Sequence, residues 1–102
     1  MPLHLRIKKQ YFDEIAAGTK KIEYREGKEY YWSRLVNMDE NGEFVSFKPI
    51  NEIVFINGYH KDAPRMRVAV EKIEFIEVKD NGEIYQDFAI HLGKVLHLGE
   101  EA

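Results

Sequence analysis

Apolar and polar side chains alternate through much of this chain, and the alternation predicts mainly β-structure. In residues 3–8, Leu3, Leu5 and Ile7 share one face and polar side chains occupy the other, a pattern typical of a half-buried strand. Residues 20–26 alternate in the same way, which predicts a second strand. Residues 52–57 are apolar on both faces, so this segment should be a central strand of the sheet.

Two segments instead show the spacing of short helices. In residues 9–18 apolar side chains recur four positions apart, and Gly18 stands where a left-handed C-terminal cap is favoured. In residues 29–36 the pairs Tyr31–Leu35 and Trp32–Val36 have the same spacing. We expect Ile22, Tyr24, Trp32 and Leu35 to belong to the core.

The second half of the chain contains strands and turns only. Residues 65–79 are long for one strand, and their apolar parity switches near Glu71 and Lys72, which predicts a β-bulge or bend. Asp80-Asn81-Gly82 predicts a hairpin turn. Residues 83–92 and 94–98 are expected to be two strands, broken at Gly93. The polar segment 37–51, with Asn41-Gly42, is expected to be a peripheral loop or hairpin with a returning strand at 43–47.

These elements predict a β-rich α+β fold with six or seven strands and two short helices in the N-terminal third. Strand-dominated chains of this length, with a bend inside one strand, are typical of small barrels. We therefore expect a small β-barrel of about six strands. The length of 102 residues favours one domain, spanning 1–102.

Composition narrows the function classes. The chain has no cysteine, so disulfides and thiolate chemistry are excluded, and its histidines lack metal-ligand spacing. We expect no metal site and no cofactor. No apolar run has the length of a membrane helix or a signal peptide, which favours a cytoplasmic protein without membrane contact. The net charge is −3, yet residues 1–35 hold eight Lys and Arg against five Asp and Glu.

The basic excess surrounds one notable strand. Glu23 and Arg25 would point the same way along the segment 20–26, with Lys20 at its start. A guanidinium beside a carboxylate can hold a phosphate or a base edge, while the carboxylate accepts a hydrogen bond from a base amino group. A lysine beside an apolar wall can act as a base or nucleophile. The alternative is a solvated face with a weak ion pair.

Aromatic residues near this strand suit a nucleobase platform. Tyr30, Tyr31 and Arg34 lie on one short helix, and stacked aromatic and guanidinium groups bind unpaired bases. In the loop 57–64, Asn57 could read a base edge, Gly58 would let a ligand approach backbone amides, and Tyr59 could stack. The alternatives are core packing for the aromatic residues and an ordinary connecting loop.

The order of these blocks resembles the ASCH domain, a small relative of the PUA domains. The chain contains the fixed residues of the G-x-K-x-x-E-x-R pattern, Gly18, Lys20, Glu23 and Arg25, after the first predicted helix. Tyr31-Trp32-x-Arg34-Leu35, Phe55-x-Asn57-Gly58-Tyr59 and Ala63-Pro64-x-Met66-x-Val68 follow in order. The resemblance covers nearly the whole chain except residues 37–51, which look like an insertion.

The resemblance implies a PUA-like barrel with a cleft that binds RNA or a nucleotide. By residue-by-residue transfer, the cleft would be lined by Lys20, Glu23 and Arg25, with Tyr31, Arg34, Asn57, Gly58 and Tyr59 near its rim. One branch of the family resembles amidohydrolases that deacetylate N4-acetylcytidine. Lys20 matches that branch's lysine, and Glu23 occupies its threonine position, where it would be a general base for water. Glu71 or Glu74 would be the distal acid. A further alternative is a module that binds a protein partner.

Overall fold

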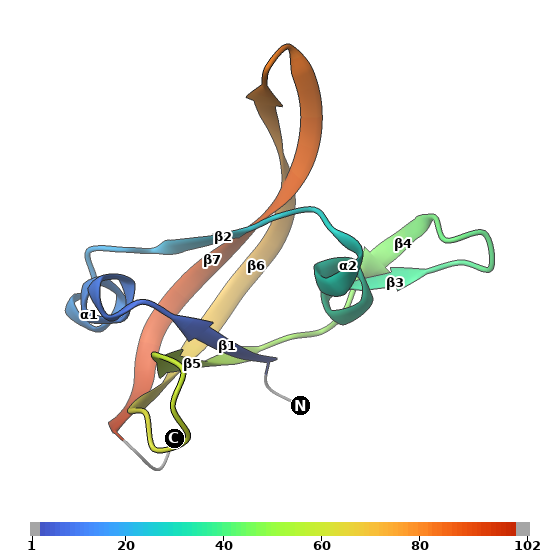
Figure 1. Cartoon of the computed structure of the whole chain (residues 1–102). Helices are drawn as coiled ribbons and strands as arrows, with labels where there is room; N and C mark the ends of the chain where they lie inside the picture. The colour runs from blue at the N-terminus through green and yellow to red at the C-terminus, as the bar shows by residue number, and fades with distance from the viewer. Residues whose placement is uncertain (1–2, 100–102) are drawn as a thin grey trace.

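Nine elements follow one another along the chain in the computed structural model, which describes residues 3–99 (Figure 1). They are β1 (Leu3–Ile7), α1 (Lys9–Ala17), β2 (Ile22–Arg25), α2 (Glu29–Leu35), β3 (Val36–Met38), β4 (Phe44–Phe47), β5 (Glu52–Asn57), β6 (Arg65–Asp80) and β7 (Glu83–Gly99). The prediction of a β-rich α+β fold with two early helices is confirmed.

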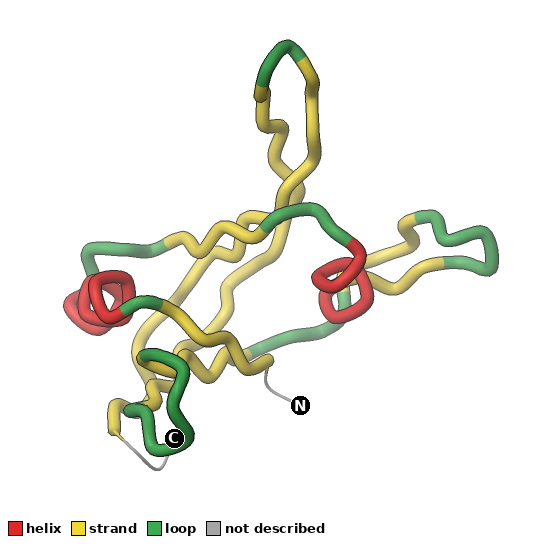
Figure 2. The backbone as a smooth tube through the Cα atoms, in the orientation of Figure 1, coloured by secondary structure: helices red, strands yellow, loops and turns green. Residues whose placement is uncertain are grey.

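Five of the strands form one curled sheet in the order β1-β5-β6-β7-β2. β1 pairs with β5 in parallel, and the other three pairings are antiparallel. β5 is buried from Ile53 to Ile56, as its two apolar faces predict. β3 and β4 form a separate hairpin that extends beyond the sheet (Figure 2).

The long pair β6–β7 contains the predicted bend. Its register shifts at three points between Arg67 and Lys72, so the parity switch is confirmed as a β-bulge. The turn at the far end is confirmed as well, with Asn81 and Gly82 both at positive φ. The predicted break at Gly93 is wrong, because β7 runs without interruption from Glu83 to Gly99. The irregular register of β6 lets β7 bend without leaving the sheet.

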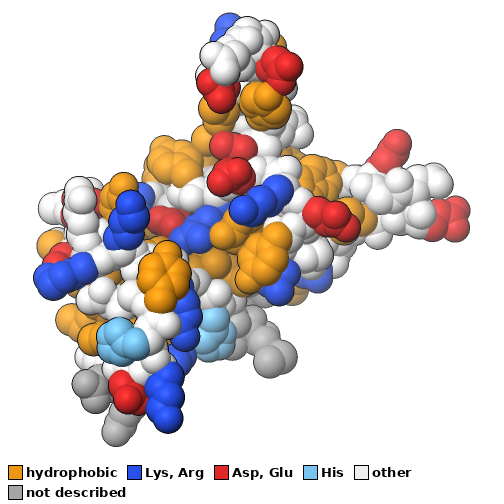
Figure 3. Space-filling view, in the orientation of Figure 1, with side chains coloured by type: hydrophobic (Ala, Val, Ile, Leu, Met, Phe, Trp, Pro, Cys, Tyr) orange, Lys and Arg blue, Asp and Glu red, His pale blue; other side chains and the backbone are white. Residues whose placement is uncertain are grey.

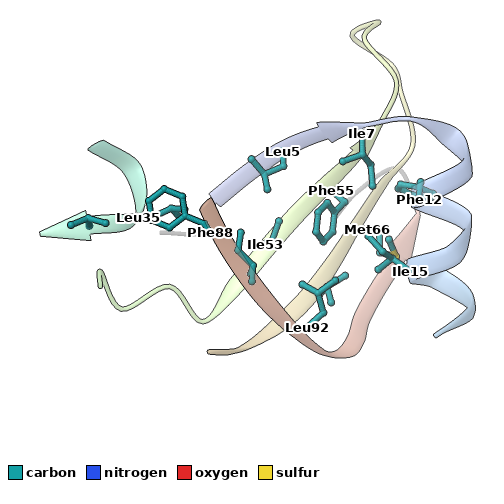
Figure 4. Close-up of a cluster of buried hydrophobic side chains, with 13 residues drawn as sticks. Leu5, Ile7, Phe12, Ile15, Leu35, Ile53, Phe55, Met66, Phe88 and Leu92 are labelled. Carbon is teal, nitrogen blue, oxygen red and sulfur yellow. The ribbon is translucent and has the colours of Figure 1, made fainter. Parts of the chain in front are cut away.

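The concave side of the sheet holds the main core. Side chains of β1, β5, β6 and β7 meet Phe12 and Ile15 of α1, which are at most 5% exposed (Figure 4). Gly18 ends α1 in the left-handed conformation, as predicted. At the other end of the core, Phe75 of β6 lies within 5.4 Å, centroid to centroid, of the rings of four aromatic residues: Trp32, Phe44, Phe47 and Phe88. This cluster fastens α2 and the β3–β4 hairpin to the sheet.

Two predictions, one about the core and one about closure of the sheet, are not confirmed. Tyr24 is 53% exposed and does not belong to the core, because β2 turns Glu23 inward instead. The predicted closure into a barrel is not confirmed either. In the described residues 3–99, β1 and β2 each keep one unpaired edge. A pocket separates the two edges, and both strands contribute side chains to it.

Candidate functional site

The pocket between the edges of β1 and β2 has a volume of about 270 Å³, and we call it the seam pocket. Four basic side chains line it: Arg6, Lys8, Arg25 and Lys28. Four tyrosines line it too: Tyr11, Tyr24, Tyr31 and Tyr59. Glu23, Glu26 and Ile7 complete the lining. α1 and α2 stand at the two ends of the seam (Figure 1).

Glu23 is the anchor of the pocket. Its side chain is 8% exposed, and Glu23 is the buried charged residue of the described part of the chain. Arg25 donates to its Oε2 twice, from Nε at 2.9 Å and from Nη2 at 2.6 Å. A carboxylate buried to this degree needs such partners, since burying an unpaired charge is costly. The inward face of β2 is therefore a charged pair held against the core.

Arg25 is fixed on its other side by Tyr31. Its Nη1 donates to the Tyr31 hydroxyl at 2.9 Å. Burial alone would lower the pKa of Arg25, but the hydrogen bonds to Tyr31 and Glu23 and the charge of Glu23 outweigh it and raise that pKa. Arg25 is therefore a permanent cation. Three of the five guanidinium N–H groups are used by these bonds, so two are left for a ligand.

Lys20 lies next to the Glu23–Arg25 pair, outside the pocket lining. Its Nζ donates to the carbonyl of Ile22 at 2.8 Å and lies 3.6 Å from Glu23 Oε1. The ammonium also lies 5.3 Å from the ring centroid of Tyr11 and 5.8 Å from that of Tyr24. The structure thus brings Lys20, Glu23 and Arg25 together, although only the last two line the pocket. An amidohydrolase role would require the Lys20 amine to break its hydrogen bond to the Ile22 carbonyl and turn toward the pocket.

Exposed rings surround the basic groups. Tyr59 is 75% exposed on the loop after β5, and Tyr11 and Tyr24 are 40% and 53% exposed. Gly58 places this loop beside β1, because its N–H donates to the Ile7 carbonyl and its own carbonyl accepts from Arg6 Nη1. The Gly58 amide is therefore used inside the fold and does not face a ligand. Tyr59 is carried to the rim by these bonds.

The seam pocket is basic in an acidic protein. Four Lys and Arg against two Glu leave its lining with an excess of two positive charges, and Lys20 adds a third directly behind it. The whole chain has a net charge of −3. In the space-filling view, Lys and Arg side chains gather across the middle of this face with aromatic and apolar side chains between them (Figure 3). Such a concave, positive surface raises the local concentration of anions.

Three of the five expected rim residues, Arg34, Asn57 and Gly58, do not line the seam pocket. Arg34 stacks on Tyr30, with its guanidinium carbon 3.6 Å from the ring centroid, and lines a different pocket. Asn57 ends β5, its N–H donates to the Pro64 carbonyl, and it does not line the seam pocket. Tyr30 and Tyr31 are neighbours on α2, yet each faces a different pocket.

The acids considered as a distal catalytic group also lie away from the seam pocket. The Glu74 carboxylate is hydrogen-bonded to His91 Nε2 and lies 3.7 Å from Lys72 Nζ. The hydrogen bond from His91 lowers the pKa of Glu74 below its usual value, and the Lys72 charge adds to this. Glu71 lines a separate pocket with His91. Both acids lie on β6.

In residues 3–99, no three His, Cys, Asp or Glu side chains are grouped so that they could hold a metal ion. Over the same residues, no helix has the length and apolar character needed to cross a membrane.

Sequence reasoning missed seven lining residues: Arg6, Ile7, Lys8, Tyr11, Tyr24, Glu26 and Lys28. Arg6 and Lys8 carry a usable signal, because both occupy the polar face of the alternating segment 3–8. That face becomes a pocket wall only because the sheet curls until β1 stands opposite β2. The positions of Tyr11 and Lys28 depend on how α1 and α2 are placed, which local periodicity does not specify.

Comparisons of the chain with protein-family models, with curated proteins and with solved structures found no match.

Proposed function

We propose that this chain is an ASCH-type, PUA-like domain that binds single-stranded RNA or a nucleotide in the seam pocket. The curled sheet would then be an open form of the PUA-like barrel, with the unpaired edges of β1 and β2 leaving room for the ligand. The observation that carries the proposal is the hydrogen-bonded Glu23–Arg25–Tyr31 network, with Glu23 buried, in the lining of a basic pocket.

Each part of the network suits such a ligand. The two remaining N–H groups of Arg25 match a phosphate or the acceptor edge of a base. The Tyr31 hydroxyl accepts from Arg25 and can still donate its own proton to the ligand. Arg6, Lys8 and Lys28 add charge for neighbouring phosphates, and Tyr59 offers an exposed stacking face. A pocket of about 270 Å³ has room for an unpaired base and not for a duplex.

The test is a fluorescence-anisotropy titration with a labelled, mixed-sequence, single-stranded RNA octamer at low salt. Arg25→Ala is expected to weaken binding at least tenfold, because it removes both the charge and the fork of donors. Tyr59→Ala should weaken it by roughly five-fold or more, since stacking contributes about 1–3 kcal/mol per base. Tyr59 is so exposed that its removal leaves the fold intact, which circular dichroism would verify for both variants.

Arg67→Ala is the matched control. Arg67 is paired with Glu52 on the sheet and lies outside the seam pocket, so its removal changes net charge by the same amount. Binding that is as tight in folded Arg25→Ala and Tyr59→Ala as in the Arg67→Ala control would contradict the proposed function.

A further inference from the structure

A second pocket lies on the other side of α2. It has a volume of about 690 Å³ and is formed by the start of β1, the exposed side of α2 and the segment that follows β4. We call it the helix pocket and define it by Tyr30, Ser33, Arg34, Asn37, Lys48 and His4. Leu3, Pro49 and Ile50 supply its apolar part.

The helix pocket has the chemistry of an anion site with a stacking surface. Arg34 and Lys48 are its two permanent cations, and none of its nine described lining residues is acidic. Both cations are held in place. Arg34 Nη1 donates to the Tyr30 carbonyl at 3.1 Å, and Lys48 Nζ donates to the Ser33 carbonyl at 2.8 Å. The guanidinium carbon of Arg34 lies over the Tyr30 ring, 3.6 Å from its centroid, so the two groups form a cation–π platform.

The helix pocket continues the seam pocket. Residues 6–8 line the seam pocket and Leu3 and His4 line the helix pocket, so the two follow one another along β1. On α2 the junction is the pair Tyr31 and Tyr30, whose ring centroids are 4.9 Å apart in an edge-to-face arrangement. Figure 1 shows α2 standing beyond the start of β1, between the seam and the β3–β4 hairpin. The two pockets are therefore neighbours along both β1 and α2, with Tyr31 lining one and Tyr30 the other.

We propose that the helix pocket is a second subsite for the same single-stranded RNA. It would bind a nucleotide beyond the one held in the seam pocket, with Arg34 and Lys48 on its phosphate and the Tyr30–Arg34 platform beneath its base. This inference rests on the proposed function for the first nucleotide. Lys48 lies in the segment 37–51, which the ASCH resemblance does not cover, so the subsite is a property of this chain.

The experiment compares RNA of two lengths. Mixed-sequence, fluorescein-labelled dinucleotides and octanucleotides are titrated with the intact chain and with the double variant Arg34→Gln/Lys48→Gln. We expect the double variant to bind the octanucleotide roughly tenfold more weakly, because two phosphate contacts and one stacking contact are lost. Its affinity for the dinucleotide should change less than about twofold. The control, Arg67→Gln/Lys72→Gln, removes the same charge outside both pockets.

Backbone amide shifts of the intact chain, followed by NMR during the octanucleotide titration, separate this inference from the proposed function. Shifts at residues 23–28, at 33–37 and at Lys48 and Ile50, with the length-dependent loss, support both. Shifts at 23–28 alone, with the double variant binding like its control, overturn the second subsite and leave the proposed function standing. Shifts at 33–37, Lys48 and Ile50 alone support an RNA site in the helix pocket but overturn the proposed function. No shift in either set overturns both.

Discussion

Glu23 faces the core of this protein because three neighbours stabilise its charge there. Arg25 donates two hydrogen bonds to Glu23 Oε2, and Lys20 Nζ lies 3.6 Å from Glu23 Oε1. The Tyr31 hydroxyl accepts a further hydrogen bond from Arg25 and so holds the guanidinium in position. Neither the carboxylate nor the guanidinium would be stable at this depth alone. The pair therefore acts as one structural unit, in which Glu23 orients the Arg25 guanidinium.

This unit predicts a non-additive stability cycle. Glu23→Ala should lower the free energy of unfolding by about 3 kcal/mol, because it leaves the Arg25 charge without its partner. The double variant Glu23→Ala/Arg25→Ala should lose less than Glu23→Ala alone, since no unpaired charge remains. Urea unfolding measures all of these values.

Glu52 and Arg67 provide the comparison for that cycle. They form an ion pair between β5 and β6, but their side chains are 34% and 40% exposed. Their coupling energy should stay below about 1 kcal/mol. Equal coupling in the two cycles, or losses that simply add in the Glu23–Arg25 cycle, would show that Glu23 and Arg25 are not a buried unit.

The placement of α2 depends on a close contact between its leading loop and β7. A Cβ atom built on Gly27 would lie 1.7 Å from the carbonyl oxygen of Gln86, and the Gly27 N–H donates to Asp87 Oδ1 at 3.0 Å. β7 cannot yield, because β6 pairs with it along this stretch. The loop therefore sets where Lys28 and Tyr31 enter the seam pocket.

Gly27→Ala is expected to lower the free energy of unfolding by about 1–3 kcal/mol, as overpacking does, and to weaken RNA binding through the displaced loop. Gly93→Ala is its control. There a Cβ would lie 3.3 Å from the Ala69 Cβ, which moves only with its backbone, and 3.3 Å from the Glu71 Cγ, which can rotate away. Alanine is also preferred over glycine inside a strand by about 0.5–1 kcal/mol, so its net effect should be near zero. Thermal unfolding and the octamer titration are measured for Gly27→Ala and Gly93→Ala. Equal losses of stability and of affinity in the two variants would contradict the role assigned to Gly27.

Local patterns were sufficient to predict most elements and insufficient to predict which face of β2 turns inward. Leu3, Leu5 and Ile7 share a face that no polar residue interrupts, so the direction of β1 follows from the sequence. In the predicted strand 20–26, both faces carry charged residues, and the apolar residues Ile22 and Tyr24 suggested the wrong one. The outcome was decided by Tyr31 and by the neighbouring β7, which lie six or more positions away along the chain.

At the scale of the whole molecule, the seam exists because the sheet curls without closing. Arg6 and Lys8 reach the site from the strand at one edge and Arg25 from the strand at the other. The G-x-K-x-x-E-x-R pattern indicated only the second edge. Arg6 and Lys8 are positioned by the parallel pairing of β1 with β5, which lies some fifty residues later in the chain. A short sequence motif cannot indicate such a distant pairing.

The same architecture separates charge. Six Lys and Arg side chains line the seam and helix pockets, while the chain as a whole carries −3.

If these side chains neutralise about three to six phosphates of a bound RNA, counterions are released in proportion. The logarithm of the affinity should then fall linearly with the logarithm of the salt concentration, with a slope between about −2 and −4. Octamer titrations from 25 to 300 mM potassium chloride (roughly the range over which screening changes most) measure that slope. Arg34→Gln/Lys48→Gln should reduce its magnitude by about 1.4, whereas Arg67→Gln/Lys72→Gln should leave it unchanged. If both double variants reduced the slope equally, net charge rather than the two pockets would govern binding; a slope near zero would mean that phosphate groups are not what this face recognises.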